Sequence, residues 1–268
     1  MPDHRRGQRI AQGRTAEIFA WGEDRALKLF RKDFPGASVG QEADITRKVH
    51  AAGLPVPEIE GVVEVEGRRG IVFARIDGPS LLENIASKPW TLAAAARLLA
   101  ELHAAIHTRT LPELPSQRLR LESRIRGAEI LTVSTKDAVL RALGDLPDGS
   151  VLCHGDFHPG NILLSPRGAI VIDWMDASAG NPLADVARTA VLLRLGVLPP
   201  GTIGRWLLES GRILFHRVYL RRYIQLRPVS REQIAAWHLP VAAARLAEDI
   251  PEQGRLLGLI QALLANQA

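Results

Sequence analysis

One short loop and the hairpin that follows it constrain this chain more than any other part of its 268 residues. The loop at 154–161 has the sequence HGDFHPGN, and two short apolar runs follow it, joined by a Ser-Pro-Arg-Gly turn at 165–168. Runs of this length around a Pro and Gly turn are typical of two antiparallel strands. The hairpin predicted for 162–172 carries Asn161 and Asp173 back to neighbouring positions.

The polar side chains of this segment suit phosphoryl transfer. That reaction requires a carboxylate to orient the attacking hydroxyl, and oxygen ligands for the magnesium ion that neutralises the triphosphate. Asp156 is followed five residues later by Asn161, which is the spacing of a kinase catalytic loop. Asp173 adds a second hard oxygen ligand of the kind that Mg²⁺ prefers. We therefore predict that Asp156 is the catalytic residue and that Asn161 and Asp173 bind the metal.

Two charged residues upstream complete the set that such a site requires. A kinase holds the phosphates with a lysine, and a glutamate keeps that lysine in place. Residues 25–30 alternate as a strand with Lys28 among apolar neighbours, and residues 41–52 predict a helix that opens with Glu42. Each would pass for an ordinary solvated charge if it stood alone. Because both precede the Asp156 loop in the expected order, we predict that Lys28 grips the phosphates and pairs with Glu42.

The loop at 154–161 resembles the catalytic loop of the aminoglycoside phosphotransferase and choline kinase superfamily, small-molecule relatives of the protein kinases. Gly155 stands where that superfamily has glycine and where protein kinases have arginine. Downstream, IDW at 172–174 and NPLADVA at 181–187 also resemble the superfamily's metal-binding segment and the helix after it. The resemblance implies an α+β, bilobal protein-kinase-like fold. A small antiparallel-sheet lobe would occupy residues 1–76, and a larger, mainly helical lobe residues 77–268.

The same resemblance implies roles for individual residues. Asp156 would be the catalytic base, and Asp185 a structural carboxylate that braces the loop. The phosphate donor would be ATP or GTP, bound with magnesium. The helices at 201–268 would wall the pocket of a small-molecule hydroxyl acceptor.

Two further segments are candidates for nucleotide binding. Residues 10–19 predict a turn over the phosphates, in which Gly13 allows close backbone approach and Thr15 offers a hydroxyl, although an ordinary hairpin turn would have the same sequence. A hairpin with a Gly-bounded turn follows at 62–76. By resemblance, the end of this hairpin is the hinge whose backbone binds adenine, namely Phe73, Ala74, Arg75 and Ile76.

Two other functions remain alternatives. His154, Asp156 and His158 alternate, so on an extended chain they would face one way and bind a metal, as in a hydrolase. That hypothesis leaves the remaining predicted site residues unexplained. A catalytically silent, regulatory pseudokinase would bind nucleotide, but such proteins usually lose a member of the base or metal set that this chain retains.

Composition narrows the possible partners. The net charge is +5, but arginines are scattered beside glutamates without interleaved aromatic residues, so we expect no nucleic-acid function. No apolar run of signal-peptide or membrane-spanning length occurs, so we expect a cytoplasmic protein that does not bind membranes.

The single cysteine, Cys153, fits a reducing compartment and is interpreted as a buried apolar residue rather than a nucleophile. The sequence contains no pattern that predicts the oligomeric state.

The acceptor is the least constrained part of the prediction. Polycationic aminoglycosides call for carboxylates, whereas nine arginines and only five acidic residues follow position 201. Four aromatic residues there would form either an aromatic box for a quaternary ammonium such as choline or ordinary core, namely Trp206, Tyr219, Tyr223 and Trp237. His103 and His107, spaced i and i+4 on a predicted helix, are interpreted as packing or hydrogen-bonding residues rather than metal ligands. Aminoglycoside-like, choline-like and other small alcohols all remain open.

Overall fold

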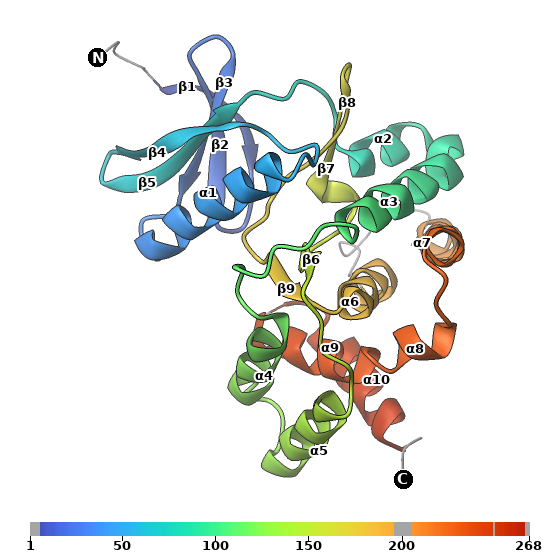
Figure 1. Cartoon of the computed structure of the whole chain (residues 1–268). Helices are drawn as coiled ribbons and strands as arrows, with labels where there is room; N and C mark the ends of the chain where they lie inside the picture. Colours follow the sequence, from blue (N-terminus) through green and yellow to red (C-terminus); the bar gives the residue numbers. More distant parts are fainter. Residues whose placement is uncertain (1–5, 196–204, 249, 266–268) are drawn as a thin grey trace. The chain divides into compact units, whose positions relative to one another are not determined.

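The structure, a computed structural model, describes residues 6–195, 205–248 and 250–265. The chain forms two compact units, and each unit combines two separate stretches of sequence. The first unit comprises residues 1–83 and 160–176, and the second comprises residues 84–159 and 177–268. The predicted α+β class, with a small antiparallel sheet followed by a mainly helical chain, is confirmed (Figure 1). The lobe boundary expected at residue 76 stays a prediction.

Five antiparallel strands form the sheet of the first unit, in the order β1-β2-β3-β5-β4 (Figure 1). They are β1 (Arg6–Gln12), β2 (Ala16–Trp21), β3 (Arg25–Phe30), β4 (Ile59–Val65) and β5 (Arg68–Ala74). The hairpin predicted around the second turn is confirmed, because Val62 pairs with Ile71 across β4 and β5. Its turn places Glu66 and Gly67 at positive φ values of 53° and 69°, the left-handed conformation that tight hairpin turns require.

Helix α1 (Gly36–Ala51) covers one face of this sheet through an apolar cluster. Side chains alternate between the two faces of a strand. In β3, Leu27 and Leu29 therefore pack in a cluster on one face, while Phe30 joins the cluster that contains Val39 of α1 on the other. The same alternation assigns Lys28 to the face that α1 covers.

The hairpin predicted after the loop at 154–161 forms part of the first unit. It consists of β7 (Ile162–Ser165) and β8 (Gly168–Val171), in register from the Ile162–Val171 pair to the Ser165–Gly168 pair. Two backbone hydrogen bonds hold it to earlier segments, from Leu164 N to Pro79 O at 2.9 Å and from Val171 N to Pro55 O at 2.8 Å. Gly78 allows this approach, because a Cβ atom there would overlap the Leu164 carbonyl.

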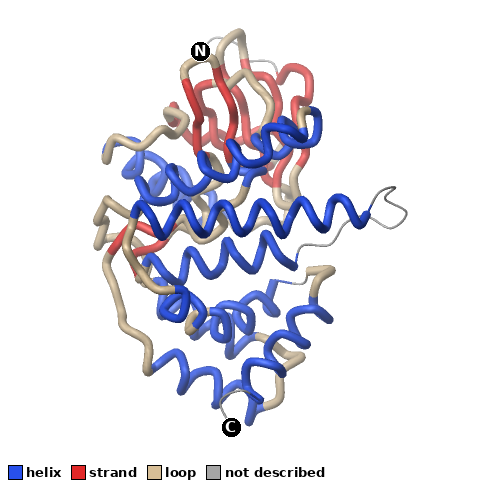
Figure 2. The backbone as a smooth tube through the Cα atoms, turned by 90° about the vertical axis from the view of Figure 1, so that its right-hand side faces the viewer, coloured by secondary structure: helices blue, strands red, loops and turns tan. Residues whose placement is uncertain are grey.

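The second unit is mainly helical, and one short strand pair enters it, β6 (Val151–Cys153) with β9 (Ser178–Gly180). Helix α7 (Arg205–Leu226) packs along α3 (Leu92–Ile106) and beside α6 (Pro182–Leu195), as Figure 2 shows. Helix α9 (His238–Arg245) is buried from Leu239 onward and contacts its neighbours on several sides. The remaining helical elements are α2 (Leu81–Ser87), which crosses between the units, α4 (Gln117–Gly127), α5 (Val133–Gly144), α8 (Arg231–Ala235), α10 (Gln253–Ala265), and the short 3₁₀ turns η1 (Pro89–Thr91), η2 (Pro159–Asn161) and η3 (Leu246–Glu248).

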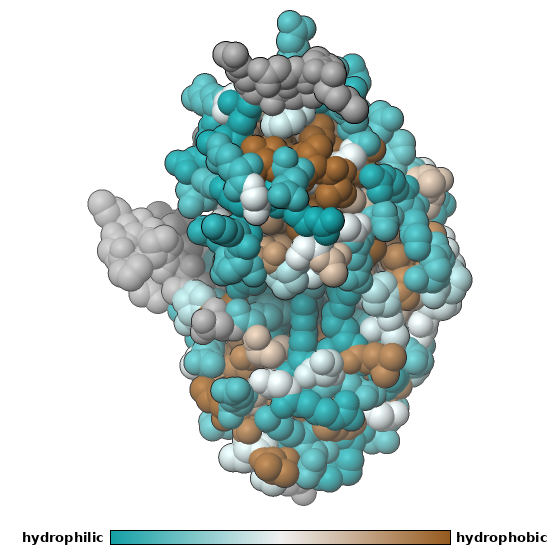
Figure 3. Space-filling view, turned by 90° about the vertical axis from the view of Figure 1, so that its left-hand side faces the viewer, coloured by the Kyte–Doolittle hydropathy of each residue, from teal (hydrophilic) through white to brown (hydrophobic). Residues whose placement is uncertain are grey.

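On the face that Figure 3 shows, apolar atoms surface in separate patches between hydrophilic ones. Among the residues that the structure describes, no helix combines the length and the apolar character needed to cross a membrane.

Candidate active site

Three charged side chains meet in the first unit. The ammonium of Lys28 lies 2.6 Å from Glu42 Oε1 and 2.9 Å from Asp173 Oδ1. Lys28 comes from β3, Glu42 from α1, and Asp173 from the segment after β8. The predicted partners Lys28 and Glu42 are therefore in direct contact, and the predicted metal ligand Asp173 joins them.

Burial and charge act in opposite directions on this cluster. Burial acts to lower the pKa of Lys28, but the nearby charges of Asp173 and Glu42 outweigh it and raise that pKa above its ordinary value. Burial raises the pKa of Glu42, and the positive charge of Lys28 opposes this. One carboxylate oxygen, Glu42 Oε2, is buried without a hydrogen-bond partner among the described residues. Glu42 therefore depends on Lys28 to offset the cost of its burial.

Asp173 and Asn161 lie at the open end of the β7–β8 hairpin. The backbone N–H of Ile172 donates to the carbonyl of Asn161 at 3.0 Å, which aligns the two flanking side chains. Asp173 has a positive φ of 66°, an uncommon backbone conformation for a residue other than glycine, and its side chain is 42% exposed. Carboxylate and amide oxygens are ligands that suit Mg²⁺, and the ammonium of Lys28 already occupies a cation position against Asp173.

The predicted phosphate turn lies between β1 and β2. Its backbone is closed by a hydrogen bond from Gly13 N to Ala16 O at 2.8 Å, and a bond from Arg31 N to Thr15 O at 2.9 Å ties it to the end of β3. The Arg31 guanidinium also donates to the Arg14 carbonyl at 2.7 Å. Gly13 is exposed and Thr15 half-buried, so both stay at the surface of the first unit.

The predicted hinge lies at and beyond the end of β5, and its amides differ in availability. The N–H of Ala74 donates to Glu58 O at 2.9 Å, and the N–H of Arg75 donates to Asp24 O at 3.0 Å. No hydrogen bond from the backbone N–H of Ile76 is present among the described residues. Phe73 lies inside β5, paired with Ala26 of β3. Ile76 is therefore the hinge residue whose amide is open to a ligand.

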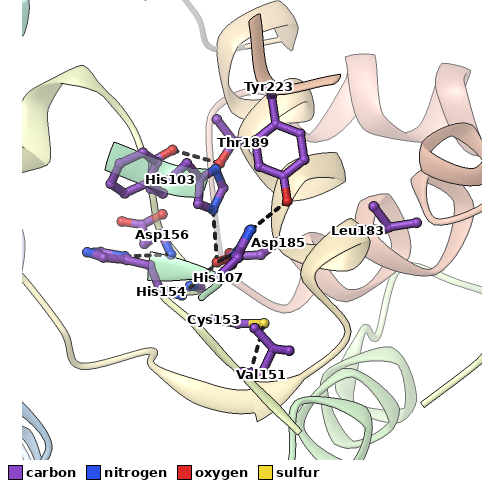
Figure 4. A network of polar contacts seen from close by, with 12 residues as sticks. His103, His107, Val151, Cys153, His154, Asp156, Leu183, Asp185, Thr189 and Tyr223 are labelled. Atoms are coloured by element: carbon purple, nitrogen blue, oxygen red, sulfur yellow. Dashed lines mark hydrogen bonds and ion pairs between the residues drawn. The ribbon is translucent and has the colours of Figure 1, made fainter. Parts of the chain in front are cut away.

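In the second unit, helix α6 holds the backbone of the predicted catalytic loop (Figure 4). The carboxylate of Asp185 accepts hydrogen bonds from His154 N at 2.6 Å and from Gly155 N at 2.9 Å. Gly155 has φ of +80°, which glycine adopts without strain. One turn later, the Thr189 hydroxyl donates to the carbonyl of Phe157 at 2.9 Å. Asp185 thus lies where a loop-bracing carboxylate is expected.

Asp156 projects from this loop between two cationic or potentially cationic groups. Its Oδ1 lies 3.4 Å from Arg188 Nη2, and its Oδ2 lies 3.6 Å from His158 Nε2. Burial acts to raise the pKa of Asp156, but the hydrogen bond from His158 and the charge of Arg188 outweigh it and hold that pKa well below its ordinary value. The side chain is 30% exposed, so an ionised carboxylate oxygen is accessible to a hydroxyl.

A buried polar network surrounds Asp185 (Figure 4). The Nε2 atoms of His103 and His107 lie 3.1 and 3.4 Å from Asp185 Oδ2. Their Nδ1 atoms lie 2.7 Å from the Tyr219 hydroxyl and 2.6 Å from the Tyr223 hydroxyl, respectively. All four imidazole nitrogens are therefore hydrogen-bonded. The interpretation of the two histidines as hydrogen-bonding residues is confirmed, although their ligand atoms and that of Asp185 lie within 4.8 Å of one another.

The same contacts correct the aromatic-box hypothesis. Tyr219 and Tyr223 are fully buried with their hydroxyls bonded to imidazoles, and Trp237 is 2% exposed. These three residues are core and cannot line a pocket for a quaternary ammonium. The side chain of Trp206 lies outside the described residues.

The hydrolase hypothesis is also not supported by the loop geometry. The N–H of Asp156 donates to His154 Nδ1 at 3.2 Å, so this imidazole nitrogen is used within the loop. Among the described residues, the group of His, Cys, Asp and Glu side chains close enough to share a metal is His103, His107 and Asp185, not the loop trio. Cys153 is buried, and burial raises the pKa of its thiol well above the ordinary value, which agrees with an inert apolar role.

Sequence patterns missed the charged residues that surround Asp156. Arg188 donates to Glu248 Oε1 at 2.6 Å, and Glu248 also contacts Arg124 and Arg245. Arg188 follows Asp185 by three residues on a predicted helix, and this spacing was an available signal that Arg188 faces the same loop as Asp185. Glu248 lies sixty residues further on, and no local pattern identifies it.

Comparisons with known proteins identify the family and the fold of the chain. The model of the phosphotransferase enzyme family matches residues 6–207. The structure resembles a thermostable mutant of aminoglycoside phosphotransferase APH(4)-Ia solved with ADP and hygromycin B, with a TM-score of 0.70 and 19% identity over 97% of this chain and 94% of that one. It also resembles an aminoglycoside-3'-phosphotransferase of type VIII, with a TM-score of 0.61 and 20% identity over 91% and 94% of the two chains.

A third similar structure is the amicoumacin kinase hAmiN in complex with AMP-PNP, Ca²⁺ and Ami, with a TM-score of 0.63 and 14% identity over 100% of this chain and 90% of that one. No curated protein sequence matches the chain. The structural likenesses establish the kinase-like fold, and the family match extends from β1 through the Asp156 loop and α6. The chain belongs to the phosphotransferase enzyme family.

Proposed function

We propose that this protein is an ATP-dependent phosphotransferase that moves the γ-phosphate to a hydroxyl group of a small molecule. The observation that carries the proposal is the contact of Lys28 with both Glu42 and Asp173. In phosphoryl transfer, a lysine fixed by a glutamate neutralises the phosphates, and a neighbouring aspartate binds their metal ion. Family membership and the similar structures solved with ADP and AMP-PNP support ATP as the donor. Both of these nucleotides are adenine nucleotides.

Each proposed donor-binding group has a distinct task. Lys28 places its ammonium on the phosphates, and Glu42 holds Lys28 in position. Asn161 and Asp173 would hold a magnesium ion, which supplies charge neutralisation for the phosphates when bound. The Ile76 amide would donate to adenine, since no hydrogen bond from it is present among the described residues, and the turn with Gly13 and Thr15 would cover the phosphates.

The acceptor hydroxyl is proposed to bind Asp156. Its carboxylate is ionised and accessible, so it can accept the hydroxyl hydrogen bond and orient the oxygen toward the γ-phosphate. Asp156 precedes Asn161 by five residues along the chain, which is the spacing of a kinase catalytic loop. The hydroxyl oxygen bonds to the γ-phosphorus as the bond from that phosphorus to the ADP oxygen breaks. The hydroxyl proton passes to Asp156 late in this step, because the transition state of phosphoryl transfer is loose and demands little nucleophile activation. The proposed setting is the cytoplasm, where ATP is available.

The test combines binding with turnover. Thermal unfolding with and without magnesium ATP measures nucleotide binding, and ADP release across a panel of hydroxyl compounds measures transfer. We expect stabilisation by magnesium ATP, and acceptor-dependent ADP release that Asp156→Asn strongly lowers. Stabilisation with no Asp156-dependent turnover on any acceptor or on water would identify a silent nucleotide-binding protein instead. Failure of magnesium ATP to stabilise the parent would remove the basis of the proposal.

A further inference from the structure

Side chains of helix α6 contact four successive residues of the catalytic loop. Three of these contacts are to the loop backbone, and the fourth is to the side chain of Asp156. Asp185 binds the backbone N–H groups of His154 and Gly155, and Thr189 binds the carbonyl of Phe157. Between them, Arg188 binds the carboxylate of Asp156. Positions 185, 188 and 189 lie on one face of a helix because they are three and four residues apart. The helix therefore fixes both the path of the loop and the direction of its reactive side chain.

Arg188 is itself anchored, and more tightly than it holds Asp156. Its Nη1 lies 2.6 Å from Glu248 Oε1, whereas its Nη2 lies 3.4 Å from Asp156 Oδ1. The side chains of Arg188 and Glu248 are only 9% and 11% exposed. Glu248 also receives Arg124 at 3.1 Å on Oε1 and Arg245 at 3.1 Å on Oε2. A buried carboxylate shared by three guanidinium groups is a rigid anchor, because each charge-assisted contact restricts the others.

We propose that Arg188, anchored by Glu248, is the positioning residue that aims the carboxylate of Asp156 at the acceptor hydroxyl. This inference rests on the proposed function, since it assigns Asp156 the acceptor. One side of the guanidinium is held by Glu248, and the other side is presented to Asp156 at a distance that leaves the carboxylate able to accept a further hydrogen bond. Lysine has no planar fork, so it cannot make both contacts in this geometry.

The charge of Arg188 also sets the protonation of Asp156. The groups that face this carboxylate are Arg188 from α6 and His158 and His154 from its own loop, and Glu248 of η3 faces it through Arg188. A cation nearby favours the ionised form and extends it to lower pH. A weakly basic carboxylate suits a residue that orients a hydroxyl rather than one that removes its proton early.

The experiment compares Arg188→Gln, Arg188→Lys and Glu248→Gln with the parent. We expect Arg188→Gln to lower kcat for ADP release by about 10- to 100-fold, the usual effect of removing an outer partner of a reactive group. The acid limb of its pH profile should move up by about 1 to 3 pH units, because Asp156 loses a neighbouring cation. The Kd for magnesium ADP should stay unchanged. Arg188→Lys should restore the position of the acid limb but only part of kcat, and Glu248→Gln should lower kcat with Arg188 still present.

Arg118→Gln is the matched control, because Arg118 is a half-buried arginine of α4 that donates to the carbonyls of Leu143 and Leu146 at 2.6 Å. It should change stability without moving the acid limb. An acid limb that stays in place in Arg188→Gln, or a loss of activity matched by the control, would overturn the role of Arg188. If Arg188→Gln does not fold, the same measurements on Arg188→Lys and Glu248→Gln test the role of Arg188.

A second measurement separates this inference from the proposed function. In the full-length protein labelled with ¹³C at the aspartate carboxyl carbons, the Asp156 resonance is assigned by its loss in Asp156→Asn. Its titration should move to higher pH in Arg188→Gln but not in Arg118→Gln. An unchanged titration would contradict the pairing even in an active enzyme. A shifted titration in a protein without turnover would contradict the proposed function and leave the pairing intact.

Discussion

The imidazole of His107 lies 3.4 Å from the carboxylate of Asp185 in a fully buried setting. Burial acts to raise the pKa of Asp185, but hydrogen bonds from His103 and His107 hold it well below its ordinary value. An ionised carboxylate only accepts, so His107 Nε2 donates to Asp185. Burial together with His103 lowers the pKa of His107 to about 4, so its imidazole is neutral near pH 7 and Nδ1 accepts from the Tyr223 hydroxyl.

Stability should consequently fall in mildly acidic solution. The pKa of His107 is about 4 in the folded protein, below its ordinary value of 6.5. Neutral His107 therefore contributes fully to the free energy of unfolding above pH 6.5, and this contribution is lost as the pH falls toward 4. The shift corresponds to roughly 3 kcal/mol. Urea unfolding of the parent and of His107→Gln at several pH values measures this contribution, and the variant should show the shallower dependence.

The exposed residue His50 provides the control, because His50→Gln should keep the full pH dependence of the parent. His216 and His238, whose pKa values are also lowered to about 4 by burial, contribute in the same direction and are retained in both variants. Equal slopes for His107→Gln and the parent would show that His107 is not held neutral.

Removing Asp156 should separate turnover from donor binding. Asp156→Asn keeps the size of the side chain but not its charge, so we expect kcat to fall by roughly 10² to 10⁴. The Kd for magnesium ATP should be unchanged, because the proposed donor-binding groups belong to the other unit. Steady-state ADP release and calorimetric titration measure the two quantities. An equal loss in Asp137→Asn, a substitution in α5, would point to a general effect of lost charge.

The pairing of Lys28 with Glu42 predicts non-additive stability. Lys28→Met leaves Glu42 buried without its cation, which should cost about 3 to 5 kcal/mol of unfolding free energy. Lys28→Met combined with Glu42→Leu replaces the pair with apolar groups and should recover much of that loss. A double-mutant cycle in guanidinium chloride measures the coupling. Additive effects of the two substitutions would contradict an energetic dependence of Glu42 on Lys28.

The backbone at Asp173 allows its conformation and its charge to be tested apart. Asp173→Ala and Asp173→Gly both remove the carboxylate, so both should lose stabilisation by magnesium ATP. Glycine tolerates φ of +66°, whereas alanine does not, so the glycine variant should be more stable than the alanine variant by about 1 to 2 kcal/mol. Thermal unfolding with and without magnesium ATP records both effects. Equal stability of the two variants would show that the loop relaxes.

The charged residues around Asp156 also predict which acceptors react poorly. Glu248 and Glu252 are occupied by arginines of the same chain, with Arg245 Nη2 2.7 Å from Glu252 Oε1. A polycation has few free carboxylates to bind there. Hygromycin B and streptomycin should therefore give lower kcat/KM in ADP release than uncharged polyols. Higher kcat/KM for either aminoglycoside would reject this expectation without affecting the assignment of Asp156.

The sequence predicted the parts of the candidate site that depend on local pattern and order along the chain. Alternation in residues 25–30 predicts the side of the strand that carries Lys28, and the apolar runs after Asn161 predict the hairpin that aligns it with Asp173. The arginine and glutamate behind Asp156 were not predicted, because α6 and η3 approach each other only through tertiary packing. The hinge amides were equally unpredictable, since the partners of Ala74 and Arg75 lie in other segments.

Aromatic residues show a different limit of sequence reasoning. Tyr219 and Tyr223, four residues apart on α7, have the same spacing whether they line a pocket or pack in a core. Their packing in the core follows from the hydrogen bonds between their hydroxyls and the imidazoles of His103 and His107, which lie on α3 and at its C-terminal end. Only the packing of α3 along α7 separates the two interpretations.

The division between the two compact units falls inside the loop at 154–161, between Pro159 and Gly160. Lys28, Glu42, Asn161 and Asp173 stand on one side of that division, and Asp156 stands on the other with α6 and the C-terminal helices. Substitutions that refit the chain to a new hydroxyl compound can therefore accumulate in the second unit. The residues proposed to bind the nucleotide and its metal ion, which belong to the first unit, would remain unchanged by such substitutions.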